Sequence, residues 1–357
     1  MSVSEPPVKG YRVAIVGASS LLGKELLSVL RHRRFPFERL VEIGASGRPD
    51  FALEPPILDL DVGNSEAFFD PEVRGDELDI AFVAARPDPL PSFLRPQSAR
   101  PGVIIDMEQG LAESLEATPL IALANDLPPQ TIEKAGGAAI AAAHPATIVL
   151  SLLLARLASQ LSVRSAVAHI FLPASNLGSR GIDELQKQTV GLLSFQKIPK
   201  SVFGAQLAFN NLPRLGGSGS GSLEGIAKRV RGELERSFTA RIAVPALRFI
   251  QASVFYSLAI SLYVELQESA KPSALNQALE GSYVKLRRPS EQAPTQVEAA
   301  GGNEILIDSA LPDAGGTNGF WIWAAADNLH LAAENAVRIA EAFTRVSKFA
   351  ETGGRPN

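Results

Sequence analysis

A loop bounded by two glycines near the N-terminus is the first place where residue type and spacing suggest chemistry. The apolar run Arg12 to Val16 leads into GASSLLG and then into a helical pattern. One glycine permits a tight turn, another permits close packing of helix on strand, and N–H groups at the helix start can bind a pyrophosphate. The spacing therefore predicts a dinucleotide-binding loop made by Gly17, Ser19, Ser20, Leu21, Leu22 and Gly23.

The middle glycine of such a loop is replaced here by Ser20. Its side chain stands where the phosphate would approach, whereas the hydroxyl of Ser19 can donate to a phosphate oxygen. Two interpretations stay open: the loop binds a nucleotide, or the domain has kept the turn and lost the ligand.

The end of the second predicted strand bears on which nucleotide would bind. Leu40 to Ile43 is followed by Ser46 and Arg48, with no acidic residue between them. An acid there would bind a ribose 2′-hydroxyl, whereas serine and arginine suit a 2′-phosphate. The pattern favours NADP over NAD, with an ordinary surface arginine as the alternative for Arg48.

Sulfur chemistry is excluded, because the 357 residues include no cysteine and so no thioester, disulfide or thiolate metal site. The four histidines, at 32, 144, 169 and 330, show no metal-ligand spacing, and we expect no metal. His144 precedes a predicted helix and could act as a base or nucleophile. We favour the other interpretation, in which it satisfies backbone groups at the helix start.

The composition is that of a globular protein, with 46% apolar and 20% charged residues and a formal net charge of −4. This balance argues against nucleic acid as a partner. The N-terminus lacks the order of a signal peptide, and no apolar stretch approaches the roughly 18 residues of a membrane span. We expect a cytoplasmic protein with no membrane segment.

Strand and helix patterns alternate in the first part of the chain. This alternation predicts an α/β fold with a doubly wound parallel sheet. The expected strands are Arg12–Val16, Leu40–Ile43, Asp79–Ala84, Val103–Asp106 and Ala138–Ala143.

The pattern changes after Pro145, where longer strands stand beside separate helices. This predicts an α+β domain with a mainly antiparallel sheet. Strands are expected at His169–Leu172, Ala243–Ile250 and Val254–Leu266, and helices at Gly181–Leu193, Leu223–Phe238 and Leu329–Phe349. We expect domains at 1–145 and 146–326, and a terminal helical segment at 327–357.

Taken together, several segments resemble the aspartate-semialdehyde dehydrogenase family over nearly the whole chain. They are VAIVGASSLLG, FPFERL, LDIAFVAA, VIIDME, ASNLGSRGIDELQKQ, QLAFNNLP and WAAADNLHLAAENAVRIAE, in family order. QLAFNNLP and ASVFYS most resemble the Usg-type paralogues of that family. The resemblance implies a Rossmann domain, an inserted α+β dimerisation domain, and a C-terminal helix that returns to the first domain.

The family reaction, as the resemblance implies it, is the NADPH-dependent reductive dephosphorylation of an acyl phosphate through a cysteine thioester, with a histidine base. In the family pattern Asn328 meets the cofactor amide and Glu224 corresponds to a substrate-binding acid. The cysteine position is Pro145, the histidine position is Leu258, and the carboxylate-binding arginine position is Gln251. The phosphate-binding arginine should fall near Ala112, and it is missing too.

Four separate losses predict that the family activity is absent. The leading hypothesis is a non-catalytic homodimer with a binding or regulatory role, which holds a nucleotide or another small molecule. A second hypothesis is an NAD(P)-dependent oxidoreductase that acts on an aldehyde or oxo group without a cysteine. A third is partnership with an active paralogue.

Overall fold

The computed structural model describes residues 10–44, 73–85, 90–95, 98–111, 117, 119–123, 139–215, 222–238, 242, 244–288, 290–316 and 318–351. The predicted positions Ser46, Arg48 and Ala112 lie outside these residues. The chain divides into two compact units. Unit 1 comprises 1–117, 127–142 and 336–357, and unit 2 comprises 118–126 and 143–335.

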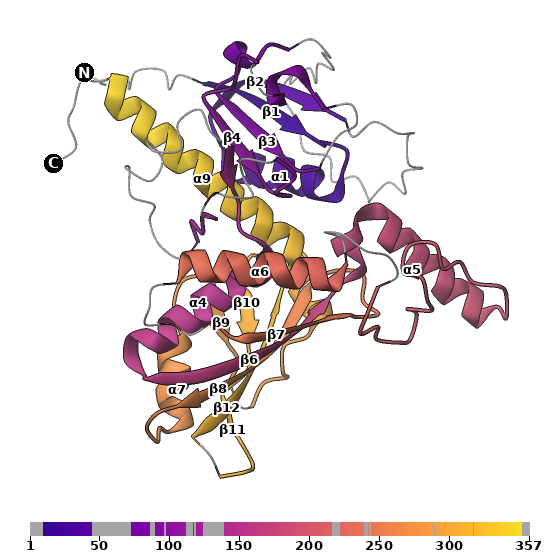
Figure 1. Cartoon of the computed structure of the whole chain (residues 1–357), viewed down its shortest axis with the longest axis vertical. Coiled ribbons are helices and arrows are strands. Elements are labelled where there is room, and N and C mark those ends of the chain that lie inside the picture. Colours follow the sequence, from indigo (N-terminus) through magenta and orange to yellow (C-terminus); the bar gives the residue numbers. More distant parts are fainter. Residues whose placement is uncertain are drawn as a thin grey trace. The chain divides into compact units, whose positions relative to one another are not determined.

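Unit 1 contains a parallel sheet of five strands in the order β2-β1-β3-β4-β5, shown in Figure 1. All neighbouring strands pair in parallel, which confirms the predicted doubly wound α/β fold. The strands are β1 (Tyr11–Val16), β2 (Phe37–Ile43), β3 (Ile80–Val83), β4 (Val103–Asp106) and β5 (Ala139–Ala141). Strands β3, β4 and β5 are buried along their whole length, as expected for a sheet covered on both faces. Two short 3-10 turns, η1 (Gly75–Glu77) and η2 (Ser92–Leu94), lie before and after β3.

Helix α1 (Leu21–His32) follows β1 directly and buries Leu22, Leu26 and Leu30. Its last turn carries Arg31 and His32, which favour a helix C-terminus through the macrodipole. The chain then leaves the helix through Arg34, whose φ is +53°. The basic residues at 31–34 therefore mark the end of α1.

Helix α9 (Asn328–Glu351) ends the described chain, and its residues from 336 on belong to unit 1. Within unit 1, Arg33 pairs with Glu341 through two hydrogen bonds of 2.8 Å. The Tyr11 hydroxyl also donates to the Thr344 carbonyl, at 3.2 Å. These contacts link β1 and α1 to the last helix, more than 300 residues along the sequence.

Unit 2 contains a mixed sheet of seven strands, in the order β7-β6-β8-β12-β10-β9 with β11 paired to β12. Four pairings are antiparallel and two, β6 with β7 and β9 with β10, are parallel, so the sheet is mainly antiparallel as predicted. The longer strands are β6 (Val163–Leu172), β7 (Ala246–Gln251), β8 (Leu258–Leu266) and β12 (Gly319–Ala326). The short ones are β9 (Val284–Leu286), β10 (Ile305–Ile307) and β11 (Leu311–Pro312).

The starts of three predicted strands were wrong: β6 begins at Val163 and not at His169, β7 begins at Ala246 and not at Ala243, and the third lies before β8. Val254–Leu266 was expected as a single strand, but β8 begins only at Leu258. Ser257, just before it, has a φ of +69°, a left-handed conformation that interrupts an extended chain. Residues 252–257 therefore form the turn between β7 and β8.

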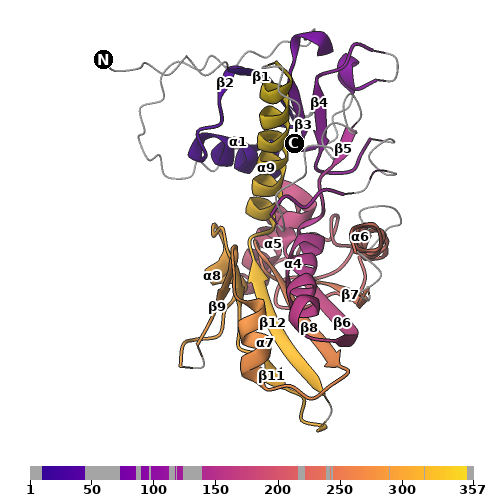
Figure 2. The same cartoon turned by 90° about the vertical axis from the view of Figure 1, so that its left-hand side faces the viewer.

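The core of unit 2 lies between its sheet and three helices, α4, α6 and α7, which are labelled in Figure 2. Helix α4 (Pro145–Gln160) is buried on nearly every side, with ten buried residues between Ala146 and Leu157. Helices α6 (Leu223–Ser237) and α7 (Pro272–Leu279) bury one apolar stripe each. The remaining helical segments are η3 (Ala174–Leu177), α5 (Gly178–Leu193) and α8 (Gln296–Ala299).

Two buried polar residues of α5 hold the segment that follows it. The Glu184 carboxylate accepts hydrogen bonds from the Ser201 hydroxyl and from the N–H groups of Val202 and Phe203, at 2.7 to 3.0 Å. Gln188 accepts from Leu207 and Ala208. Burial raises the pKa of Glu184, but the hydrogen bonds outweigh it, led by that from Phe203, and hold the pKa below its ordinary value.

Candidate functional site

The glycine-bounded loop of unit 1 has the geometry that the sequence predicts. Gly17 directly follows β1 with a φ of +82°, and a Cβ there would lie 2.7 Å from the Ala85 nitrogen. A Cβ on Gly23 would lie 2.2 Å from the Gly17 carbonyl oxygen. Both positions therefore need glycine, the first for a left-handed turn and the second for close packing of α1 on the loop.

Ser20 serves as the N-cap of α1. Its hydroxyl accepts a hydrogen bond from the Gly23 N–H at 3.0 Å and donates to the Ala84 carbonyl at 3.5 Å. The side chain that could have crowded a phosphate is thus bonded within the loop itself. In the part of the chain that the structure describes, the N–H groups of Ser19, Leu21 and Leu22 donate to no acceptor.

These N–H groups lie at a switch point of the sheet. From β1 the chain goes first to β2 on one side and later to β3 on the other. Ligands of open α/β sheets bind outside the carboxyl ends of the strands at such a reversal. The loop after Val16 therefore offers a pre-formed anion site at the N-terminus of α1.

The turn after β4 is held by a buried acid of its own. Asp106 accepts hydrogen bonds from the Glu108 N–H at 3.2 Å and the Leu111 N–H at 2.9 Å. The Glu108 side chain is exposed, and Gln109 has a φ of +50°. Asp106 thus stabilises the backbone of this turn. Among residues 107–109 the only ionisable side chain is that of Glu108, which is an acid.

In unit 2 helix α4 begins with Pro145, the position that the resemblance assigns to the family cysteine. Proline suits the first helical position because its missing N–H would have no intrahelical acceptor there. His144 is the N-cap, and its Nδ1 accepts a hydrogen bond from the Ala146 N–H at 3.1 Å. The prediction that His144 satisfies the helix start is confirmed.

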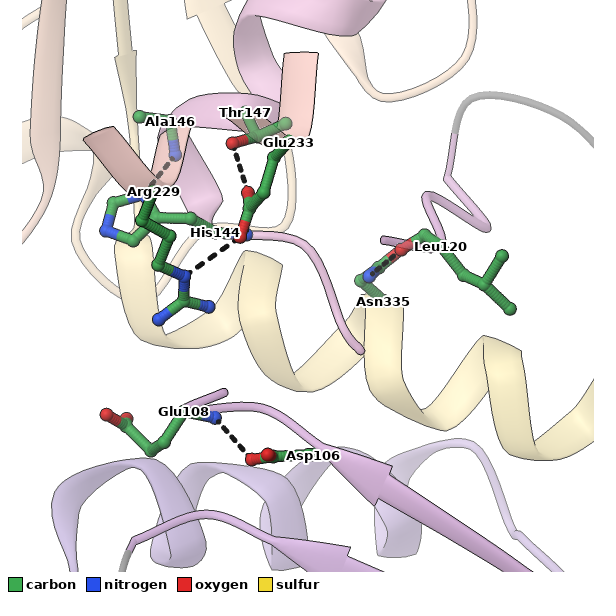
Figure 3. Close-up of polar contacts among 9 residues, drawn as sticks. All are labelled: Asp106, Glu108, Leu120, His144, Ala146, Thr147, Arg229, Glu233 and Asn335. Carbon is green, nitrogen blue, oxygen red and sulfur yellow. Dashed lines mark hydrogen bonds and ion pairs between the residues drawn. The ribbon is translucent and has the colours of Figure 1, made fainter. Parts of the chain in front are cut away.

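A fully buried carboxylate, that of Glu233 in α6, binds the same helix start, as Figure 3 shows. One of its oxygens accepts from the His144 N–H at 2.9 Å and from the Thr147 hydroxyl. The other accepts from Arg229 Nε, also at 2.9 Å. A backbone N–H, a hydroxyl and a guanidinium thus converge on one carboxylate.

His144 is held neutral by its surroundings. Burial first, and then the nearby charge of Arg229, lower the pKa of its imidazole from 6.5 to about 3, against a hydrogen bond with Asn176 that raises it. With Nδ1 accepting from Ala146, the proton of the neutral ring is on Nε2. The imidazole therefore has neither an exposed lone pair nor a pKa suited to a general base at neutral pH.

The positions that the resemblance assigns to the base and the carboxylate clamp are both in the interior. Leu258 and Gln251 are fully buried. The Gln251 amide donates to the carbonyls of Leu172 and Ala252, at 2.9 and 3.4 Å. Neither side chain can carry or transfer a proton in this arrangement.

Asp327 and Asn328 take structural roles at the start of α9. Asp327 accepts hydrogen bonds from the N–H groups of Leu329 and His330, at 2.9 and 3.0 Å, and so caps the helix. The Asn328 amide oxygen accepts from the Ser175 hydroxyl and the Ser257 N–H, at 3.2 and 3.1 Å. This oxygen is therefore bonded to η3 and to the turn before β8, both in the same unit.

The sequence did not identify Glu233 or Arg229 as site residues. It offered Glu224, which lies exposed in the first turn of α6. The only signal for the pair was its spacing of four residues, which is typical of any helical ion pair. Arg231 and Glu235 have the same spacing and are exposed, so spacing alone could not single out the buried pair.

Within the described residues, no group of three or more histidine, aspartate or glutamate side chains could hold a metal ion. In the same residues, no helix is both long and apolar enough to span a bilayer.

A doubly wound parallel sheet with a glycine-bounded loop at its switch point, followed by a mixed-sheet domain, defines a two-domain α/β protein of dehydrogenase architecture. Residues 154–331 match the model of the semialdehyde dehydrogenase dimerisation domain. The chain belongs to the aspartate-semialdehyde dehydrogenase family.

Relatives match over almost the whole length of the chain. A USG-1 protein homolog of Azotobacter vinelandii is 28% identical over 337 residues, which cover 92% of this chain and 96% of the relative. The structure of a probable aspartate-semialdehyde dehydrogenase from Pseudomonas aeruginosa is 26% identical with a TM-score of 0.77, covering 94% and 99%. The aspartate-semialdehyde dehydrogenase of Candida albicans, solved with NADP, shares the fold at 12% identity and a TM-score of 0.64, covering 95% and 99%.

The buried neutral His144 leads to a prediction about acid stability. The unfolded chain takes up a proton at this histidine near pH 6.5, whereas the folded chain resists protonation down to about pH 3. Stability should therefore fall as the pH falls below 6.5. His144→Asn keeps a good N-cap but cannot titrate, so it should lose less stability than the parent protein between pH 7 and pH 5, by about 2 kcal/mol.

Urea unfolding at several pH values measures this difference. The matched control is His32→Asn, because His32 is exposed at the end of α1. A His144→Asn variant with the same pH slope as the parent protein would contradict the neutral, buried state of His144.

Proposed function

We propose that this chain is a non-catalytic member of its family, a homodimer that binds an NADP-type nucleotide and has a binding or regulatory role. The observation that carries the proposal is Pro145 at the first position of α4. The resemblance gives this position to the nucleophilic cysteine, and a proline ring has no nucleophile. Thr147, the nearest hydroxyl in the helix, is fully buried and bonded to Glu233.

The loss extends to the groups that would assist a nucleophile. The base position is Leu258 and the clamp position is Gln251, and both side chains are fully buried. His144, the remaining histidine beside α4, is neutral and caps the helix. A thioester mechanism would have neither its sulfur nor its proton carrier.

Support for a nucleotide comes from unit 1. The three N–H groups of Ser19, Leu21 and Leu22 and the dipole of α1 offer an anion site of the kind that holds a pyrophosphate. The Candida albicans structure, which shares the fold, was solved with NADP. We assign Gly17, Ser19, Ser20, Leu21, Leu22 and Gly23 to this site, together with Ser46 and Arg48 at the 2′-phosphate and Asn328 at the nicotinamide amide.

Support for a homodimer comes from the domain match and from one face of the unit 2 sheet. Residues 154–331 match a dimerisation domain. Four half-exposed aromatic side chains lie on β6, β8 and β12, and they pair as Phe171 with Trp323 and Tyr263 with Trp321, with ring centroids 6.0 and 5.0 Å apart. A face of this kind, rich in aromatic residues, suits a second copy of the chain.

The first prediction tests the loss of catalysis. Pro145→Cys, Leu258→His and Gln251→Arg together should restore at most trace turnover, because two of the new side chains would be polar groups in a fully buried core. The assay follows NADP reduction in the presence of aspartate semialdehyde and phosphate. Robust turnover by this variant, or by the parent protein with any aldehyde, would overturn the proposal.

The second prediction tests the nucleotide site. Ser19→Asp places a negative charge at the exposed loop residue beside the predicted pyrophosphate, and it should weaken NADP binding by at least about tenfold. Ser28→Asp, exposed later in α1, is the matched control and should bind as the parent does. Calorimetric titration gives both affinities, and the absence of NADP and NADPH binding to the parent protein would remove this part of the proposal.

The third prediction tests the homodimer. Val167→Lys places a charge in the middle of the aromatic face, opposite Tyr263 in β8, and should give a monomer. Val297→Lys, at a side chain that is 82% exposed in α8, is the matched control and should stay dimeric. Sedimentation velocity reads the oligomeric state, and two variants that behave alike would refute this interface.

A further inference from the structure

A cavity of about 190 Å³ lies at the β9 edge of the unit 2 sheet, beside helix α8. Both elements are labelled in Figure 2. One water needs only about 15 Å³ of such volume, so the cavity has room for a small organic molecule. Its lining belongs to unit 2 alone and shares no residue with the nucleotide loop or with the start of α4.

The floor of the cavity is apolar. Leu306 of β10 and Ala299 of α8 line it, and both are buried in one cluster with Ala325 of β12. Leu306 is in register with Lys285 on one side and with Ala325 on the other, so these side chains share one face of the sheet. A small apolar group can therefore pack on this floor.

Four charged side chains surround the floor, two of each sign, and the lining has no net charge. Lys285 pairs with Glu304 at 3.8 Å, and both side chains are about half exposed. Arg287 pairs with Glu298, and the Arg287 side chain is mostly buried. An ion pair as exposed as that of Lys285 contributes little to stability, so groups of a ligand can replace it at small cost.

The Arg287 guanidinium is incompletely bonded. Its Nε is buried and has no hydrogen-bond acceptor in the part of the chain that the structure describes. The ion pair with Glu298 is made by Nη2. A buried donor without an acceptor is unfavourable. A carboxylate that binds the guanidinium in the bidentate manner would accept from both nitrogens and remove this cost.

The charge balance of the lining selects the class of ligand. A simple carboxylate would meet Arg287 and Lys285, but it would also be repelled by the two glutamates. A simple amine would meet the opposite difficulty. An α-amino acid carries one charge of each sign on the same carbon atom, so every charged group of the lining can have a partner and the total charge of the site stays at zero.

We propose that this cavity binds a small free α-amino acid. The carboxylate of the ligand replaces Glu298 on Arg287 and accepts from Nε and Nη2. Its ammonium group binds the carboxylates of Glu298 and Glu304, and its side chain packs on the apolar floor. This second ligand site goes beyond the proposed nucleotide function and does not depend on it.

Calorimetric titration of the full-length protein with glycine, L-alanine and L-serine tests the site. We expect at least one of them to bind with a Kd of about 1 mM or tighter. The N-acetyl derivative of that amino acid lacks the ammonium charge and its methyl ester lacks the carboxylate charge. Each derivative should bind at least about tenfold more weakly than the free amino acid.

Two substitutions test where the amino acid binds. Arg287→Gln removes the group that binds the carboxylate, and Glu304→Gln removes a partner of the ammonium, so each should weaken binding by at least about tenfold. The matched control is Arg288→Gln, at the next residue, which is exposed and does not line the cavity. This variant should bind as the parent protein does.

The melting temperature of each variant shows whether it is folded. Glu304 is half exposed, so Glu304→Gln gives a test that does not depend on replacing the more buried Arg287. The proposal is overturned if the parent protein binds none of the three amino acids, or if the folded Glu304→Gln variant binds as tightly as the parent. An N-acetyl derivative that binds as well as the free amino acid would show a simple anion site and would also refute it.

Discussion

A fully buried carboxylate must be surrounded by donors, and this requirement organises the start of α4. Leaving the charge of Glu233 unpaired in the interior would cost several kcal/mol. The donors that prevent this cost are fixed in place as a result: the His144 backbone, the Thr147 hydroxyl and Arg229 Nε. Because His144 and Thr147 belong to the first turn of α4, the same bonds fix where that helix begins and tie it to α6.

The backbone N–H groups at this helix start therefore stabilise the fold, whereas an enzyme of this family would use them to activate its nucleophile. Backbone N–H groups and the helix dipole lower the pKa of a thiol placed there. In this chain one N–H is bonded to Glu233 and another to the His144 ring, while Pro145 has none. The N–H groups at this helix terminus are thus bonded within the fold, and few remain to lower the pKa of a nucleophile.

Local patterns predicted most of the fold because burial dictates residue type along each element. Strands β1, β3 and β4 are short apolar runs, and α1 shows its buried stripe at Leu22, Leu26 and Leu30. The errors arose where partners are distant in sequence. Glu233 bonds to His144 across 89 residues, so no local signal separates it from Glu224 or Glu235. Likewise, nothing in the apolar run after Val254 shows that Ser257 adopts a positive φ and delays β8.

The replaced positions in unit 2 are physically linked. An arginine at the fully buried position 251 would need a carboxylate to compensate its charge, whereas the amide of Gln251 is uncharged and donates to the carbonyls of Leu172 and Ala252. A bound carboxylate substrate would supply that compensation in an active enzyme. In the non-catalytic protein that we propose, no turnover would retain such a substrate, and a permanent arginine would be a buried unpaired charge. Neutral Gln251 and apolar Leu258 avoid that cost, so under this proposal the other substitutions are favourable for stability once the cysteine is absent.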